Sequence, residues 1–236
     1  MPRVSGLFVY PVKSCRGHAV ASAAVDAWGF QGDRRYVVVS AADGKFLTQR
    51  THPRLALVET ELTATALTLA APNGGSVTVA HAEVAAARAL RPVTVWSDTV
   101  PAEDCGDAAA EWLTRLLGLP LRLARMGADF HRPVKPKRAR PGDQVSFADG
   151  APFLLTTEAS LHDLNDRIVA RGGEPVPMDR FRSNIVLADC APWAEDALGR
   201  FRLGDVEFRN GWPCGRCIVT TTDQQTAARG KEPLAT

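Results

Sequence analysis

Two cysteines near the C-terminus, Cys214 and Cys217, give the clearest chemical signal in this sequence of 236 residues. A C-x-x-C pair can form half of a zinc site, a redox-active dithiol, or one thiolate metal ligand beside a second thiol. The run that follows, residues 218–222, is β-branched throughout and predicts a strand. A thioredoxin-like site needs a helix N-terminus after its first cysteine, so this run weakens the dithiol interpretation.

A zinc site would need two further cysteine or histidine ligands, and the sequence offers none in a suitable cluster. The five histidines are single and distant from one another, and Cys15, Cys105 and Cys190 are isolated. We expect these three cysteines to be small apolar fillers or incidental thiols. An odd number of cysteines does not suggest a secreted disulfide framework, and no run of 18 apolar residues is present. We therefore expect a soluble cytoplasmic protein with no membrane association.

The elements that must position the cysteine pair are mostly short strands bounded by turns. The Asp43-Gly44 and Asn73-Gly74 turns predict antiparallel hairpins, and 107–117 has helical spacing with Asp107 as the candidate N-cap. A second helix is expected to start at 157–160. Further strands are expected at the following residues: 7–10, 35–40, 55–62, 66–70, 76–79, 93–97, 144–147, 153–156, 185–187, 203 and 206–208. The pattern predicts a β-dominated α+β fold in which the helix at 107–117 closes a first unit, and the length allows either one large unit or two small domains.

Charge provides little guidance to the partner. With 28 basic and 26 acidic residues the net charge is +2, so a nucleic acid is an unlikely partner. The segment 131–140 is basic and interrupted by proline, which predicts an exposed loop. Such a loop is either simply solvated or a charged rim for an anionic ligand or an acidic redox partner.

Several motifs, in order along nearly the whole chain, resemble those of the MOSC-domain family and of its amidoxime-reducing members in particular. They are YPVKSCRG at 10–17, GDRRY at 32–36, DCG at 104–106, SLHDLN at 160–165, FRSNIV at 181–186, CGRCIVTTTD at 214–223 and KEPL at 231–234. The resemblance implies an N-terminal β-barrel-like domain, 1–118, followed by a MOSC β-barrel, 119–236, with a molybdenum cofactor between them.

The same resemblance implies roles for individual residues. Cys217 would ligate molybdenum, and Cys214 would be a neighbour that is not a ligand. The remaining cofactor-binding residues would be Lys13, Ser14, Arg34, Arg182 and Asn184. Asp223 is a candidate catalytic residue that could orient a water, but a turn-forming aspartate is an equal alternative.

The implied activity is the reduction of small N-hydroxylated compounds such as amidoximes, hydroxylamines and N-hydroxylated bases. No flavin, haem or four-cysteine iron–sulfur motif is present, so the electrons would come from a separate ferredoxin-like or haem protein with its reductase. Two other functions stay open: a non-catalytic carrier of molybdenum cofactor or sulfur, and a metal-free thiol–disulfide protein. Some MOSC proteins are cofactor sulfurases with a pyridoxal-phosphate domain, which we do not expect here.

The sequence departs from the family pattern at three places. Gly215 replaces a serine between the two cysteines, and Gln224 stands where the family often has proline. The relatives also continue beyond the KEPL motif, whereas this sequence ends at Thr236, so we expect the family's C-terminal strands to be missing. Missing strands would leave an unpaired sheet edge.

Overall fold

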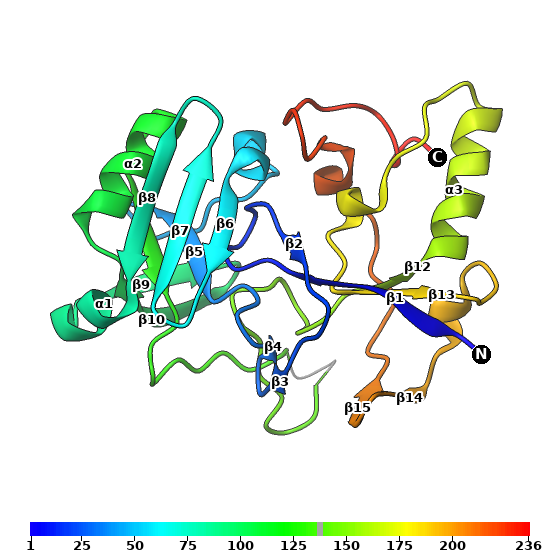
Figure 1. The fold of residues 1–236 in the computed structure, drawn as a ribbon, viewed down its shortest axis with the longest axis horizontal. Coiled ribbons are helices and arrows are strands. Elements are labelled where there is room, and N and C mark those ends of the chain that lie inside the picture. The colour runs from blue at the N-terminus through cyan, green and yellow to red at the C-terminus, as the bar shows by residue number, and fades with distance from the viewer. Residues whose placement is uncertain (136–138) are drawn as a thin grey trace.

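The computed structural model describes residues 1–135 and 139–236, and it is rich in β-structure (Figure 1). Five sheets and the α-helices α1, α2 and α3 lie in these described residues, which confirms the predicted β-dominated α+β class. Within them, no helix is both long and apolar enough to cross a membrane.

The first half of the chain is built around two sheets that enclose the main core. One sheet has the order β5 (Tyr36–Ser40), β11 (Leu121–Arg125), β10 (Asp98–Asp104) and β9 (Leu90–Val95), and the other is a meander of β6 (Glu59–Leu62), β7 (Ala66–Ala71) and β8 (Gly75–Ala80). Helices α1 (His81–Ala87) and α2 (Asp107–Leu117) lie at the end of the molecule that holds these two sheets (Figure 1). Apolar residues of both sheets and of α2 share one buried cluster, so alternating side chains of each strand hold the layers together.

A second sheet system contains strands from both ends of the sequence. Its order is β12 (Leu155–Thr157), β13 (Ile185–Ala188), β1 (Arg3–Val9) and β2 (His18–Ala19), and α3 (Glu158–Ala170) follows β12 directly. Strand β1 pairs antiparallel with β13, from Arg3 opposite Ala188 to Leu7 opposite Ile185. The first strand of the chain therefore completes a sheet whose other central strand lies far along the sequence.

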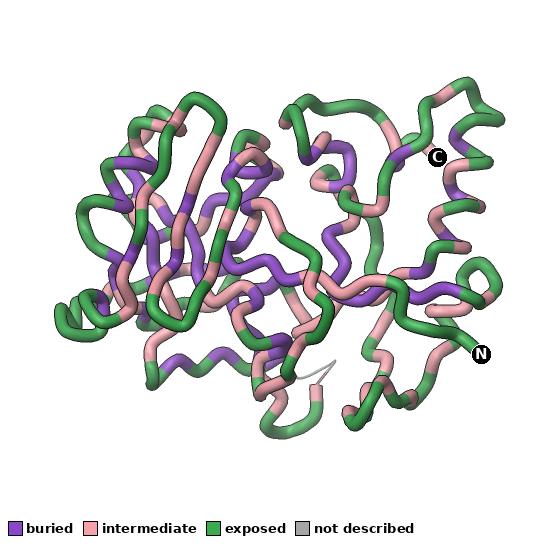
Figure 2. Tube along the Cα trace, in the orientation of Figure 1, coloured by how far each residue is buried: buried purple, intermediate pink, exposed green. Residues whose placement is uncertain are grey.

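Short elements complete the structure. Two small hairpins join β3 (Val25–Asp26) to β4 (Gly29–Phe30) and β14 (Arg200–Leu203) to β15 (Val206–Arg209). Single 3-10 turns occur at η1 (Pro53–Leu57), η3 (Met178–Phe181), η4 (Ala194–Ala197) and η5 (Ile218–Thr221). In Figure 2 much of the buried chain lies in the strands of the first half and in β13, and further buried stretches lie in connecting segments such as residues 145–148.

Most local predictions are confirmed, with informative exceptions. Helix α2 spans the predicted residues, although Gly106 rather than Asp107 is its N-cap, and Thr157 caps α3 by accepting a hydrogen bond from the Ser160 amide. The run 55–62 is only partly a strand, because it begins as a 3-10 turn. The strand expected at 144–147 is wrong: this segment makes one isolated bridge, between Gln144 and Pro133.

Candidate functional site

Cys217 lies directly before η5 and its thiol is close to a guanidinium group. The Arg50 Nη2 atom is 3.5 Å from the Cys217 Sγ atom, although the two residues are 167 positions apart. The strand predicted at 218–222 is wrong, because residues 218–221 form η5. The hydroxyls of Thr220 and Thr221 donate to the carbonyls of Cys217 and Ile218, each at 2.8 Å, so β-branched side chains here stabilise a tight turn. This turn follows the second cysteine, not the first as in a thioredoxin-like site.

A carboxylate, Asp149, joins Arg50 to the predicted cofactor residue Lys13. Its Oδ1 atom accepts from the Lys13 ammonium, and its Oδ2 atom accepts from Arg50 Nη2 at 3.2 Å. Burial lowers the pKa of Lys13 to about 8, although the neighbouring Asp149 charge opposes this shift. Burial alone would raise the pKa of Asp149, but Lys13 and Arg50 hold it well below its usual range. Asp149 is therefore a permanent anion between two cationic side chains at neutral pH.

Arg132 fixes the segment that presents Asp149. It donates to the carbonyl oxygens of Ser146, Ala148 and Asp149 and forms an ion pair with Asp98. The side chain is only 2% exposed. The prediction of an exposed basic loop at 131–140 is thus wrong for Arg132, because four acceptors compensate the burial of its charge. Residues 136–138 of that loop lie outside the described residues.

Arg34 and Asn184, both predicted to bind the cofactor, contact each other. The Arg34 Nη1 atom donates to Asn184 Oδ1 at 2.8 Å and to Asp33 Oδ2 at 2.7 Å, and Nη2 donates to the carbonyl of Arg182 at 3.1 Å. Asn184 is 1% exposed and also donates to the carbonyl of Phe8 at 3.1 Å. These bonds connect β1, the 33–34 turn and the start of β13, which places three of the predicted residues in one network.

Tyr10 lies between the two predicted arginines. The guanidinium carbon of Arg34 is 4.3 Å from the centre of the Tyr10 ring, and that of Arg182 is 4.5 Å away. Burial lowers the pKa of Arg182, but an arginine remains charged under all working conditions. The aromatic ring therefore helps to hold two like charges close together in the interior by cation–π attraction.

Two buried glutamines, Gln49 and Gln224, connect the first half of the chain to the segment after Cys217. Each side chain donates to the other, at 2.9 and 3.0 Å, and Gln49 also donates to the carbonyl of Ser14 at 2.8 Å. Ser14 adopts the left-handed backbone conformation, with φ of 69°, which turns this carbonyl toward Gln49. Gln224 also accepts from Arg182 Nη1 at 3.3 Å. The glutamine that departs from the family pattern thus has a defined role in holding Arg182.

A cavity of about 170 Å³ adjoins this network and has the properties of an anion site. Tyr10, Arg16, Arg182 and Gln224 are among the residues that line it. Arg182 Nη2 and Arg16 Nε are buried and have no hydrogen-bond partner among the described residues. The guanidinium side chains of Arg16 and Arg182 beside one cavity suit an anionic group such as a phosphate, although the carboxylate residue Asp179 also lines it.

The remaining predicted residue, Asp223, forms a turn. Its Oδ1 atom accepts from the amides of Gln225 and Thr226 at 2.9 and 2.8 Å, and its Oδ2 atom accepts from Arg180 at 2.8 Å. These are the bonds of the turn-forming alternative. Its catalytic assignment remains a prediction.

No three His, Cys, Asp or Glu side chains in residues 1–135 and 139–236 come together in a way that could hold a metal ion. A metal bound at Cys217 would therefore need further ligands from a cofactor. Cys15 and Cys105 are buried, and burial raises the pKa of each thiol to about 12, as expected for inert fillers.

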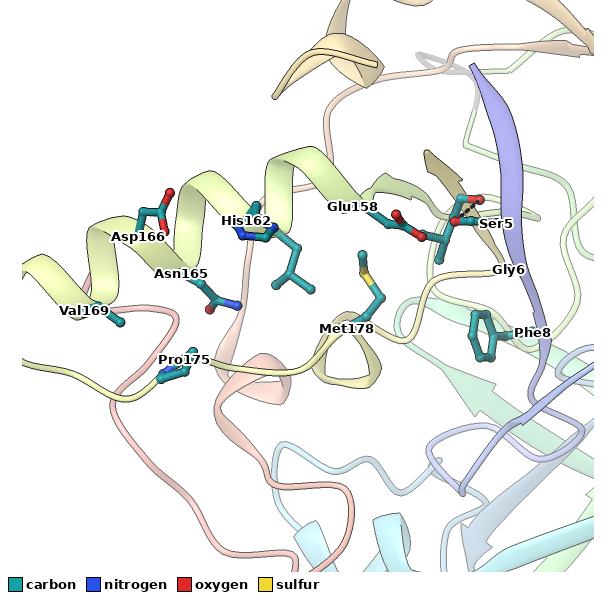
Figure 3. Close-up of a pocket in the computed structure, with 12 residues that line it drawn as sticks. Ser5, Gly6, Phe8, Glu158, His162, Asn165, Asp166, Val169, Pro175 and Met178 are labelled. Atoms are coloured by element: carbon teal, nitrogen blue, oxygen red, sulfur yellow. Dashed lines mark hydrogen bonds between the residues drawn. The ribbon is translucent and has the colours of Figure 1, made fainter. Parts of the chain in front are cut away.

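A larger cavity, of about 650 Å³, lies between α3 and β1 (Figure 3). Glu158 and His162 of α3 face it, with Met178 on the neighbouring turn. None of the predicted site residues lines it. Its wall shares Phe8 and Met178 with the smaller, basic cavity, so the two are neighbours.

Sequence reasoning missed Arg50, Asp149, Gln49 and Gln224 as members of the site. Each makes its decisive contact more than 90 residues away, where local patterns give no signal. The one local signal is the position of two long polar side chains, Gln49 and Arg50, directly after the predicted hairpin.

Comparison with known proteins identifies the class. The chain matches the MOSC N-terminal beta barrel domain over residues 1–120 and the MOSC domain over residues 142–236, so it belongs to the MOSC-domain family. It is 35% identical to the human mitochondrial amidoxime-reducing component 1 over 99% of this chain and 70% of that protein. It is also 32% identical to the human mitochondrial amidoxime reducing component 2, with the same two coverages. A molybdenum cofactor sulfurase of Drosophila grimshawi is 34% identical over 100% of this chain but only 30% of its own length.

Proposed function

We propose that this protein is a molybdenum-cofactor-dependent oxidoreductase that reduces N-hydroxylated compounds with electrons from an external donor protein. The observation that supports it best is the combination of one partly exposed thiol, Cys217, with a cavity lined by the guanidinium side chains of Arg16 and Arg182. The relationship to amidoxime-reducing components over nearly the whole chain supports the same choice of substrate.

The chain's own residues fit the cofactor at both of its ends. Cys217 would provide a thiolate ligand, and Arg50 Nη2 lies 3.5 Å from its sulfur. Arg182, supported by Gln224 and Tyr10, would bind the terminal phosphate, with Lys13 and Arg34 adding positive charge nearby. Ser14 would contribute polar atoms to the pterin edges, whereas Asn184, which is 1% exposed and bonded to Arg34 and Phe8, would act by holding Arg34 in position.

The reaction removes one oxygen from nitrogen. An N-hydroxylated group takes up two electrons and two protons and yields the N–H compound and water. The bound molybdenum cofactor would supply this two-electron chemistry, and the electrons would come from a separate ferredoxin-like or haem protein with its reductase. Asp149 keeps its negative charge at neutral pH and so holds Lys13 and Arg50 in place.

The direct test is elemental analysis combined with a turnover assay on protein purified from a host that makes the cofactor. We expect about one molybdenum per chain, and oxidation of a reduced viologen dye when benzamidoxime is added. Bound molybdenum without turnover would instead identify a cofactor or sulfur carrier, zinc would identify a zinc site, and no metal would point to the thiol–disulfide interpretation.

The buried Lys13 makes a pH-dependent prediction. Its pKa of about 8 means that the side chain is charged below pH 8 and neutral above it. Because a neutral lysine no longer attracts an anionic cofactor, cofactor retention should weaken about tenfold as the pH rises from 7 to 9. Dialysis at several pH values followed by molybdenum analysis measures this change.

The variant Lys13→Arg serves as the matched control, because its side chain stays charged throughout this range. Its retention should show a much flatter pH dependence. Equal pH dependence in both proteins would mean that another group controls retention.

A further inference from the structure

Trp96 is a bulky residue in a backbone conformation that such residues rarely adopt. It lies in the turn between β9 and β10 with φ of 58°, in the left-handed region that favours glycine and asparagine. Nearly half of the residue, 47%, is exposed to solvent. A strained backbone that holds a large apolar ring at the surface suggests a function, because such strain tends to be found at binding sites.

Three contacts fix the orientation of the Trp96 ring. Phe46 packs edge-on against it, with ring centres 5.0 Å apart. The Trp96 Nε1 atom donates to Asp149 Oδ1 at 3.2 Å. The guanidinium carbon of Arg50 is 4.8 Å from the ring centre. Arg50 is also the residue whose Nη2 atom contacts Cys217. A single side chain therefore separates the exposed indole from the thiol.

We propose that Trp96 is a specificity-determining residue, whose exposed indole stacks against the planar, conjugated part of an N-hydroxylated substrate at the Cys217 site. This inference rests on the proposed function. Aromatic rings stack readily on any flat conjugated group and do so without demanding a particular hydrogen-bond pattern. A small aliphatic substituent offers no flat surface for such stacking. The ring therefore selects for the shape of the substituent rather than for the N-hydroxyl group.

The test compares two probes that share the amidoxime group and differ in their substituent, benzamidoxime and acetamidoxime. Trp96→Asn removes the ring while keeping a residue that tolerates the left-handed conformation. In this variant we expect KM for benzamidoxime to rise about tenfold with little change in kcat. The KM for acetamidoxime should stay within about twofold, and Trp96→Phe should restore most of the preference.

Titration calorimetry on the oxidised, cofactor-loaded protein provides a readout that needs no turnover. The dissociation constant of benzamidoxime should rise by the same factor in Trp96→Asn and recover in Trp96→Phe. Equal weakening of both probes, no weakening of either, or no binding of either probe to the unaltered protein would overturn the inference. A shifted ratio of dissociation constants in a protein that reduces neither probe would preserve the stacking role and reject the proposed reductase activity.

Discussion

Replacing Cys217 with serine is expected to abolish molybdenum retention and N-reductive activity while leaving the fold intact. Serine has the shape of cysteine but gives a poor ligand for a soft metal, because its hydroxyl stays protonated at neutral pH. Cys217 is only partly buried, so its packing contribution is small and the free energy of unfolding should change by less than about 1 kcal/mol. Metal analysis, the viologen assay and urea unfolding measure the three quantities.

Cys214→Ser is the matched control for this experiment. Cys214 is exposed and lies on the irregular segment before η5. We expect that variant to keep its molybdenum and most of its activity. Full retention of molybdenum in Cys217→Ser would reject Cys217 as the ligand. Loss of molybdenum in Cys214→Ser alone would assign the ligand to Cys214.

Asn184→Ala should cause the largest loss of stability among the site residues. The amide oxygen accepts from Arg34 at 2.8 Å and from the Leu154 amide at 3.3 Å, and the amide nitrogen donates to Phe8. Alanine would leave these buried groups without their partner, at a cost of about 3 kcal/mol in the free energy of unfolding. Urea denaturation of the two proteins gives this difference directly.

A suitable control is Asn210→Ala, whose side chain makes one hydrogen bond, from Nδ2 to the Glu195 carbonyl at 3.0 Å. We expect it to lose about 1 kcal/mol or less. If both variants lost the same free energy of unfolding, the network around Asn184 would contribute no more than the single part-buried bond of Asn210.

Helices with local signals could be predicted from the sequence. Helix α2 is capped at its C-terminus by Gly118 in the left-handed conformation, and α3 is capped at its N-terminus by the side chain of Thr157. Residue types at these positions therefore indicate where the helices end and begin. Helix α1 was missed because it has no side-chain cap and only Val84 is buried, which leaves no periodic pattern to detect. The 218–222 run was misjudged because threonine hydroxyls bonded to nearby carbonyls and overrode the strand preference.

The candidate site, like the fold, could be predicted only in part from the sequence. The resemblance predicted Lys13, Arg34, Arg182 and Asn184 as cofactor-binding residues. The structure places Arg34 in contact with both Asn184 and Arg182, and Lys13 is connected to Cys217 through Asp149 and Arg50. Nothing in the sequence revealed the partners of these residues. The mutual amide pair of Gln49 and Gln224 and the buried Arg132 both depend on the tertiary fold, since a glutamine or arginine looks the same in sequence whether it is solvated or enclosed.

The pairing of β1 with β13 has a consequence for how the chain folds. Residues 3–7 are synthesised about 180 residues before their hydrogen-bonding partners at 185–188. Strand β1 therefore lacks its partner β13 while the first core forms around β5, β7 and α2. Contacts between such distant residues slow folding, because a long loop must close before the pairing brings any gain. The two halves of the molecule are consequently not independent folding units, and an isolated fragment that begins at residue 119 would lack a central strand of its own sheet.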